Sequence, residues 1–164
     1  MNSEEYAYTS IIVFCFIVDK NKILLIRRNK EPYAATLTVP GGKKEKRESL
    51  TQACIREVQE ETGLTPCSLE LAGIVHNFQE NNSNETLTFY FTCRSYSGEL
   101  RSGEEGTVEW FDIDESFTLH DVNLFYLQIA PFVFSGKKIP FEGQIVLSEE
   151  GEIIQTTIDY LKAL

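Results

Sequence analysis

Short blocks of β-branched and aromatic residues alternate with polar or glycine-containing segments along most of the chain. Such blocks predict strands when turn residues bound them. We expect strands at residues 9–18, 23–28, 36–42, 70–78, 85–95, 107–113, 141–147 and 152–158. The turns at 19–22 and 148–151 predict two hairpins, and the polar segment 79–84 predicts a loop between two strands.

Two segments instead have apolar residues at helical spacing. Residues 49–62 predict a helix, because Ser49 and Gln52 form a capping-box pattern and Gly63 supplies a stop signal. Residues 122–134 predict a second helix, with a break or kink at Pro131. Strands that flank an early helix and precede a later one are typical of a mixed α/β layered domain. With no repeat or linker, we expect residues 1–164 to form one domain.

The charge balance narrows the classes of partner. The chain is 42% hydrophobic, so it can bury a core, and its net charge is −10. A protein that binds a nucleic-acid polymer usually has a basic face, so this acidic composition disfavours such a partner. An acidic protein can still bind a polyphosphate when metal ions neutralise both.

The cysteines and the apolar run near the start of the chain indicate in which cellular compartment the protein works. Four cysteines without a CxxC pair, and only two histidines, do not fit a zinc site or a disulfide framework. The apolar run 11–18 is far shorter than the ~20 residues that cross a bilayer, and acidic residues precede it. We therefore expect a cytoplasmic protein with no membrane partner and reduced thiols.

Three glutamates of the first predicted helix share one side of it. Glu57, Glu60 and Glu61 stand at positions i, i+3 and i+4, where like charges repel. A hard divalent cation would make use of such crowding, because it prefers oxygen ligands. The alternative is a solvated acidic face, partly neutralised by Arg56.

The surrounding residues favour the cation. Residues 42–64 follow the pattern G-x5-E-x7-R-E-U-x-E-E-x-G-U, where U is a bulky aliphatic residue, and every specified position is filled. This segment resembles the Nudix box, so the chain is similar to Nudix hydrolases. The resemblance implies an α/β/α sandwich with a mixed sheet, in which the box forms a loop, a helix and a second loop.

The resemblance also implies the metal chemistry. In the family, the glutamates that match Glu57, Glu60 and Glu61 coordinate Mg²⁺ or Mn²⁺, and we expect the backbone of Gly41 to approach the same metal. Water then attacks a phosphorus of a nucleoside diphosphate linked to another group. The residue matching Arg56 orients a glutamate. The one matching Glu48 steadies the loop, and we expect Gly42 and Gly63 to be structural too.

The general base remains open between two places in the chain. The family uses either a glutamate of the box or one from a later loop. In the segment 102–111 we expect Glu105 to serve as catalytic and metal-binding residue, with Glu104 as the alternative. Both could instead be solvated loop residues.

For the phosphates we consider two basic positions, each of which could also be a solvated surface charge. Arg27 and Arg28 point to opposite faces of a strand by alternation, and the resemblance favours Arg28. Lys43 follows the glycine pair directly.

For the base, scattered cues resemble the MutT-type branch, which hydrolyses purine or oxidised purine (8-oxo-dGTP-like) nucleoside triphosphates to the monophosphate and pyrophosphate. The candidate pocket residues are His76, Phe78, Trp110, Asp121 and Asn123. Each has a structural alternative: packing for the first three, and helix capping for Asp121. Val122 follows Asp121, whereas the animal enzymes carry two adjacent aspartates there.

Three hypotheses follow. The first is a Mg²⁺-dependent nucleoside triphosphate pyrophosphohydrolase that takes a small-molecule nucleotide. The second is a Nudix hydrolase of ADP-ribose, a nucleotide sugar or a dinucleoside polyphosphate. The third is a non-catalytic nucleotide-binding module, and the intact glutamates disfavour it. The chain could be a monomer or a homodimer.

Overall fold

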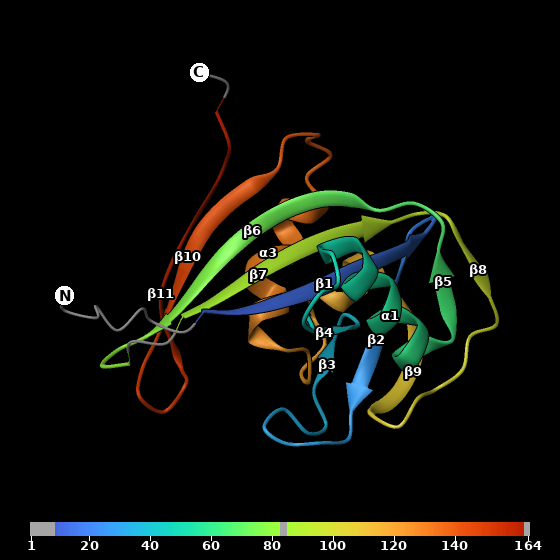
Figure 1. Cartoon of the computed structure of the whole chain (residues 1–164), viewed down its shortest axis with the longest axis horizontal. Helices are drawn as coiled ribbons and strands as arrows, with labels where there is room; N and C mark the ends of the chain where they lie inside the picture. Colours follow the sequence, from blue (N-terminus) through green and yellow to red (C-terminus); the bar gives the residue numbers. More distant parts are fainter. Residues whose placement is uncertain (1–8, 83–84, 163–164) are drawn as a thin grey trace.

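A mixed sheet forms the frame of the molecule. A computed structural model describes residues 9–82 and 85–162. Within these residues the sheet has nine strands: β1 (Thr9–Asp19), β2 (Lys22–Arg28), β3 (Leu37–Thr38), β4 (Gly41–Lys43), β6 (Glu70–Gln79), β7 (Glu85–Cys93), β9 (Gly106–Asp112), β10 (Phe141–Leu147) and β11 (Ile153–Tyr160). Their main order is β11-β10-β6-β7-β1-β2-β3, with β4 paired to β1 and β9 paired to β2 (Figure 1). β1 runs parallel to β7, and β10 runs parallel to β6.

The sheet divides along β1, and this division positions the site. β1 pairs with β2 only beside their turn, at Val18 and Asp19. Farther back, from Ile12 to Phe14, β1 pairs with β4 instead. β2 meanwhile continues beside β3 and β9. Because β2 leaves β1 after the hairpin, the two halves of the sheet separate and leave room for side chains between them.

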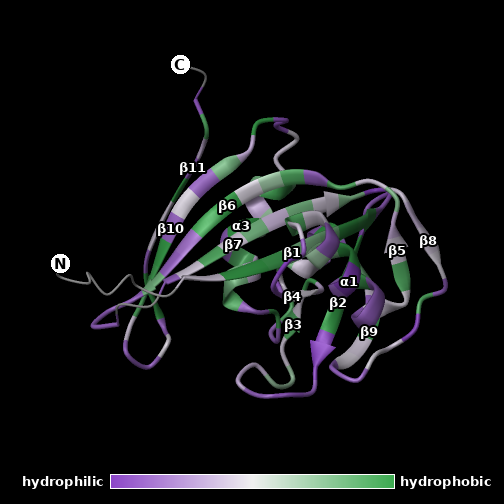
Figure 2. Cartoon of the chain, in the orientation of Figure 1, coloured by the Kyte–Doolittle hydropathy of each residue, from purple (hydrophilic) through white to green (hydrophobic). Residues whose placement is uncertain are grey.

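Helices cover both faces of this sheet. The helices are α1 (Leu50–Thr62), α2 (Ile113–Ser116) and α3 (Leu124–Val133). Figure 1 shows α1 in front of the sheet and α3 behind it. Alternation along β1 supplies both cores: Val13 and Cys15 pack with residues of α1, whereas Phe16 packs with residues of α3. The expected α/β/α arrangement is therefore confirmed, and Figure 2 shows a largely apolar β1 behind the more polar α1.

The ends of α1 follow the sequence signals. The Ser49 hydroxyl accepts a hydrogen bond from the Gln52 backbone N–H at 3.1 Å, and the Ser49 N–H donates to the Gln52 side chain at 2.7 Å. At the other end Gly63 adopts a left-handed conformation with φ 75° and donates to the Gln59 carbonyl. The predicted helix at 49–62 is thus confirmed, with Ser49 as its cap.

The later helix differs from the prediction at both ends. Val122 is not helical; it forms a bridge with Leu37, which extends the sheet. Asn123, rather than Asp121, caps the helix by accepting from the Phe125 N–H at 2.8 Å. Of the break or kink predicted at Pro131, the break does not occur at that residue, because α3 continues to Val133. A proline removes a single backbone donor, so a helix near its end can tolerate it.

Three short elements had no sequence signal. β5 (Leu64–Pro66) and β8 (Tyr96–Gly98) form a separate two-stranded sheet after α1, and α2 has a single turn. Of the expected loop 79–84, residues 83–84 lie outside the described part, as do the acidic residues that precede β1. No helix of the described chain is long and apolar enough to cross a membrane.

Candidate active site

Arg56 organises the carboxylates of α1. Its guanidinium donates two hydrogen bonds to Glu48, at 2.7 and 3.1 Å, and one to Glu57 at 2.7 Å. It also reaches Glu60 at 3.4 Å and the Lys43 carbonyl oxygen at 3.2 Å. The Arg56 hydrogen bonds lower the pKa of Glu48 to about 2. Arg56 therefore ties the loop before α1 to the helix and fixes one side of the acidic cluster.

The glycine pair allows the strand β4 to lie directly against α1. The Gly41 N–H donates to the Glu61 carboxylate at 2.8 Å. A Cβ at Gly42 would lie 2.6 Å from the Glu57 carboxyl group. A side chain at position 42 would thus displace a carboxylate of the cluster.

A loop that follows β8 brings a fourth carboxylate to the same place. Gly103 lies so close to the last turn of α1 that a Cβ there would be 2.6 Å from the Glu60 carbonyl oxygen. This contact positions Glu105, which lines a cavity together with Glu57, Glu60 and Glu61. Glu104 lines the same cavity, and its backbone carbonyl accepts a hydrogen bond from Asn29.

Burial and crowding make the cluster costly to ionise. Desolvation, and then the nearby carboxylates of Glu105 and Glu57, raise the pKa of Glu61 to about 8 even though the Gly41 N–H opposes this. Desolvation also raises the pKa of Glu57, against the effect of Arg56. A bound cation would remove this cost by neutralising the carboxylates.

The donor set fits a hard divalent cation in chemistry, since all candidate ligands are oxygens. The arrangement is not a closed cage: within the described residues, no three acidic, histidine or cysteine side chains are grouped closely enough to hold a metal ion. Arg56 holds Glu57 and Glu60 on its own side. The carboxylates would have to turn from Arg56 toward Glu61 to coordinate a shared ion.

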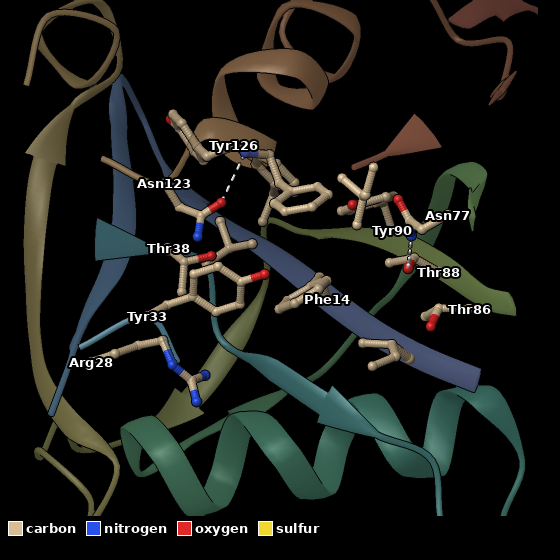
Figure 3. Close-up of a pocket in the computed structure, with 15 residues that line it drawn as sticks. Phe14, Arg28, Tyr33, Thr38, Asn77, Thr86, Thr88, Tyr90, Asn123 and Tyr126 are labelled. Carbon is tan, nitrogen blue, oxygen red and sulfur yellow. Dashed lines mark hydrogen bonds between the residues drawn. The ribbon is translucent and has the colours of Figure 1, made fainter. Parts of the chain in front are cut away.

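A second cavity lies where the sheet divides, on the α3 side. Its volume is about 240 Å³, and six aromatic residues line it: Phe14, Phe16, Tyr33, Tyr90, Phe125 and Tyr126. Figure 3 shows Asn77 and Asn123 on opposite sides of this pocket. Asn77 donates to the Thr88 hydroxyl at 2.9 Å, which fixes its amide. Arg28 lies between the pocket and α1 (Figure 3), so it connects the two cavities.

Three buried side-chain nitrogen or oxygen atoms in the described chain have no hydrogen-bond partner: Arg28 Nε, Glu61 Oε1 and Asn77 Oδ1. Buried polar groups are normally paired, so each unpaired atom requires an explanation. All three line one of the two cavities. Together they offer one donor beside the acidic cluster, one carboxylate oxygen within it, and one amide acceptor in the aromatic pocket.

Most of the chain, including most residues of both cavities, matches the model of a known family. Residues 9–131 match the NUDIX domain, which includes β1, α1 and both cavities' main walls. The chain belongs to the Nudix hydrolase family. The Nudix helix is α1, with the box residues arranged as described above.

Relatives of this Nudix chain carry two kinds of name. An ADP-ribose pyrophosphatase of Methanocaldococcus jannaschii is 32% identical over 66% of this chain, and the match spans 65% of that protein, just under two thirds of its length. An oxidized purine nucleoside triphosphate hydrolase of Danio rerio is 27% identical over 86% of this chain and 92% of its own. The crystal structure of a MutT protein from Bacillus halodurans superimposes with a TM-score of 0.80 at 28% identity, covering 92% of this chain and 97% of that one.

Three of the candidate base-pocket residues lie elsewhere in this Nudix fold. Trp110 packs on the α1 side, with its ring 5.9 Å from that of Tyr96. His76 and Phe78 contact each other on β6. Asn77, between them, lines the aromatic pocket, so alternation directs its two neighbours to the opposite face of the sheet.

The remaining candidates divide between the pocket and the surface. Asn123 lines the pocket. Asp121 instead pairs with Arg27, outside the pocket lining, and Lys43 is exposed on β4. Sequence reasoning missed Asn77 and Tyr33. Asn77 had a usable signal, since it lies among the polar residues that end β6, whereas the position of Tyr33 depends on the fold of a loop.

Proposed function

We propose that this Nudix protein hydrolyses a purine or oxidised purine nucleoside triphosphate to the monophosphate and pyrophosphate, with Mg²⁺ or Mn²⁺ as cofactor. The observation that carries the proposal is the set of three unpaired buried atoms, Arg28 Nε, Glu61 Oε1 and Asn77 Oδ1. A metal–nucleotide complex supplies a partner for each: a phosphate oxygen, a cation and an N–H group of the base.

The acidic cluster would hold the metal. Glu57, Glu60 and Glu61 offer carboxylate oxygens from one side of α1, with Glu105 facing them from the loop. When bound, a divalent ion neutralises phosphate charge and lowers the pKa of an attacking water. Arg56 keeps Glu57 and Glu60 oriented, and Glu48 anchors Arg56 through a paired hydrogen bond.

The phosphates would extend from the metal toward the aromatic pocket. Arg28 stands on that route and can donate to a phosphate oxygen, which an arginine recognises well. We assign Glu105 the role of proton acceptor for the attacking water. It borders the same cavity as Glu61, but its side chain is 43% exposed, so it can pass the proton on to solvent.

The base would enter the aromatic pocket. Its aromatic walls suit a flat ring system, since such rings stack favourably. Asn77 offers an acceptor from one side, while the Asn123 side-chain oxygen is already engaged in capping α3, which leaves its NH₂ to donate. A base that carries both an N–H donor and an acceptor would satisfy the two amides, as purines do. The Danio rerio relative's name agrees with such a substrate.

ADP-ribose is the second candidate, because the archaeal relative is named for its hydrolysis. Its adenine would meet the same two amides, but its second ribose would need space beyond the phosphates. The two candidates therefore differ in what lies past Arg28 rather than in the aromatic pocket.

A substrate panel tests the proposal. Purified protein is supplied with canonical and oxidised purine triphosphates, pyrimidine triphosphates, ADP-ribose, nucleotide sugars and dinucleoside polyphosphates, with Mg²⁺, with Mn²⁺ or with a chelator. We expect release of pyrophosphate, fastest from a purine triphosphate and only with metal. Preference for ADP-ribose would replace the substrate assignment, and turnover in the chelator would overturn the metal assignment. We expect this activity in the cytoplasm and in a monomer or a homodimer.

A further inference from the structure

All four cysteines of the chain come together at one corner of the fold, on the α1 side of the sheet. Cys15, Cys54 and Cys93 belong to one buried core cluster, from β1, α1 and β7 respectively. The Cys15 thiol lies beside both other thiols, and these neighbours together with burial raise its pKa. The mechanism proposed above uses none of them.

The fourth cysteine lies at the surface of this cluster. Cys67 directly follows β5 and is exposed. The Cys67 N–H donates to the Ser95 carbonyl at 2.8 Å. Since Ser95 is two positions after Cys93, Cys67 lies opposite the chain that leaves the end of β7. The Cys93 thiol donates to the same Ser95 carbonyl at 3.2 Å. The Cys93 sulfur and the backbone of Cys67 therefore meet at one carbonyl group, and the N–H groups of Cys67 and Ser68 are near enough to lower the pKa of Cys93.

The two residues have complementary properties. Cys67 is accessible to a dissolved oxidant, whereas Cys93 is 1% exposed and shielded from it. The Cys15 thiol, followed by the backbone groups around Cys93, lowers the pKa of Cys93 to about 7, which favours its thiolate over that of an ordinary buried cysteine. An exposed cysteine with a second cysteine beside it is the arrangement of a reacting and a resolving cysteine.

We propose that Cys67 and Cys93 form a reversible disulfide when the protein meets a peroxide. The Cys67 thiolate attacks one peroxide oxygen; the O–O bond breaks, Cys67 becomes a sulfenic acid, and the other oxygen leaves as water after taking a proton. The Cys93 thiolate then attacks the sulfenic sulfur, the S–O bond breaks, and a second water leaves. Two thiols are oxidised and one peroxide is reduced to two waters.

The Cys67 side chain needs only a local change to react in this way. Its sulfur now lies 3.8 Å from the Thr65 carbonyl oxygen, a weak contact that rotation about the Cα–Cβ bond would release. The disulfide would tie β5, which immediately follows the Nudix helix and Gly63, to the end of β7. The Cys93 sulfur would then leave the contact with Cys15 that connects it to Cys54 of α1.

The sequence provides a direct assay. Cleavage after lysine and arginine places Cys67 and Cys93 in one peptide, 57–94, which contains no other cysteine, while Cys15 and Cys54 fall in two other peptides. The full chain is treated with hydrogen peroxide, its remaining thiols are alkylated, and the peptides are weighed. We expect peptide 57–94 to lose the mass of two hydrogen atoms and to resist alkylation, and a dithiol reductant to reverse both.

Two variants separate this disulfide from other oxidation. In Cys93→Ser, Cys67 should gain oxygen atoms without any cross-link, because the resolving thiolate is absent. In Cys67→Ser, Cys93 should remain reduced, whereas Cys54→Ala, as the matched buried control, should still form the 57–94 cross-link. Oxidation of Cys93 in Cys67→Ser, or wild-type Cys67 that only accumulates oxygen, would overturn the proposal.

Discussion

The Arg28 guanidinium lies 4.0 Å from the Glu105 carboxylate, and this pair joins the two halves of the site. Arg28 borders the aromatic pocket, whereas Glu105 borders the acidic cavity on α1. Arg28 belongs to β2, and Glu105 to the loop directly before β9. β2 and β9 are paired neighbours in the sheet. The register of β2 with β9 therefore sets the distance between the aromatic pocket and the acidic cavity.

Replacing Arg28 with lysine should weaken substrate binding more than turnover. Lysine keeps the charge but loses the planar fork that matches phosphate. We expect KM for the preferred nucleotide to rise roughly tenfold, equivalent to about 1.4 kcal/mol of lost binding. Steady-state kinetics measure this. Arg27→Lys is the matched control, because Arg27 pairs with Asp121 on the other side of the strand; an equal effect in the control would contradict the role of Arg28.

Asn77 and His76 offer a sharper comparison on a single strand. Asn77→Ala removes the unpaired pocket acceptor, so kcat/KM for a purine triphosphate should fall about tenfold, the value of one good hydrogen bond. His76→Ala changes the neighbouring side chain on the opposite face and should leave kcat/KM within about twofold, because it lies outside the pocket lining. Competition between purine and pyrimidine triphosphates should show reduced discrimination only in the Asn77 variant. If both variants discriminate as the wild type does, Asn77 does not read the base.

The sequence predicted the frame of this fold because its local signals agree with its packing. The strands at 9–18 and 23–28 and the capped helix at 49–62 appear within one residue of their expected bounds; Asp19 and Lys22 join the strands on either side of the turn. The prediction for residues 121–123, at the start of the later helix, was wrong for a physical reason. These residues pair with Leu37, which is distant in sequence, and this pairing competes with the first helical turn. A single sequence carries no signal for such a contact.

The acidic half of the site was accessible to sequence reasoning, while the aromatic half was not. Glu57, Glu60 and Glu61 belong to one helix, so their spacing alone places them together. The pocket instead draws residues from β1, β2, β6, β7 and α3, which only the division of the sheet brings together. Trp110 illustrates the difference, since strand alternation about β9 directs it to the α1 side of the sheet.

Gly42 should be essential for metal use rather than for folding. A Cβ at this position would lie 2.6 Å from the Glu57 carboxyl group, so Gly42→Ala must move a proposed metal ligand. We expect kcat to fall at least tenfold and the half-saturating Mg²⁺ concentration to rise, with the thermal midpoint nearly unchanged. Activity measured across a Mg²⁺ series tests this.

Gly136→Ala is the contrasting control for that experiment. Nothing lies within 4 Å of a Cβ at Gly136, but its φ of +78° strains any other residue. That variant should lose about 1 kcal/mol of stability and keep its kcat. If the two variants lose activity in proportion to their loss of stability, Gly42 has no specific role in metal binding.

Glu61 should make the chelator-treated protein less stable as the pH rises. Its pKa in the folded protein is about 8, against a usual 4.5, so the folded state retains a proton that the unfolded state releases. The contribution of this proton is complete below pH ~4.5 and is lost as the pH rises through 8, with a slope of about 1.4 kcal/mol per pH unit between them. Glu61→Gln carries a neutral amide and lacks this dependence, so at pH 8 it should unfold at higher urea concentration than the wild type while losing nearly all activity. Urea unfolding in chelator at pH 6, 7 and 8 measures the slopes.

Glu60→Gln is the matched control, because its side chain is 61% exposed and its replacement removes a charge of α1 without removing a buried one. Excess Mg²⁺ should restore the stability of the wild type at pH 8 and leave the stability of Glu61→Gln unchanged. If the wild type and Glu61→Gln instead show parallel pH slopes, Glu61 is ionised without metal and its burial has no part in metal binding.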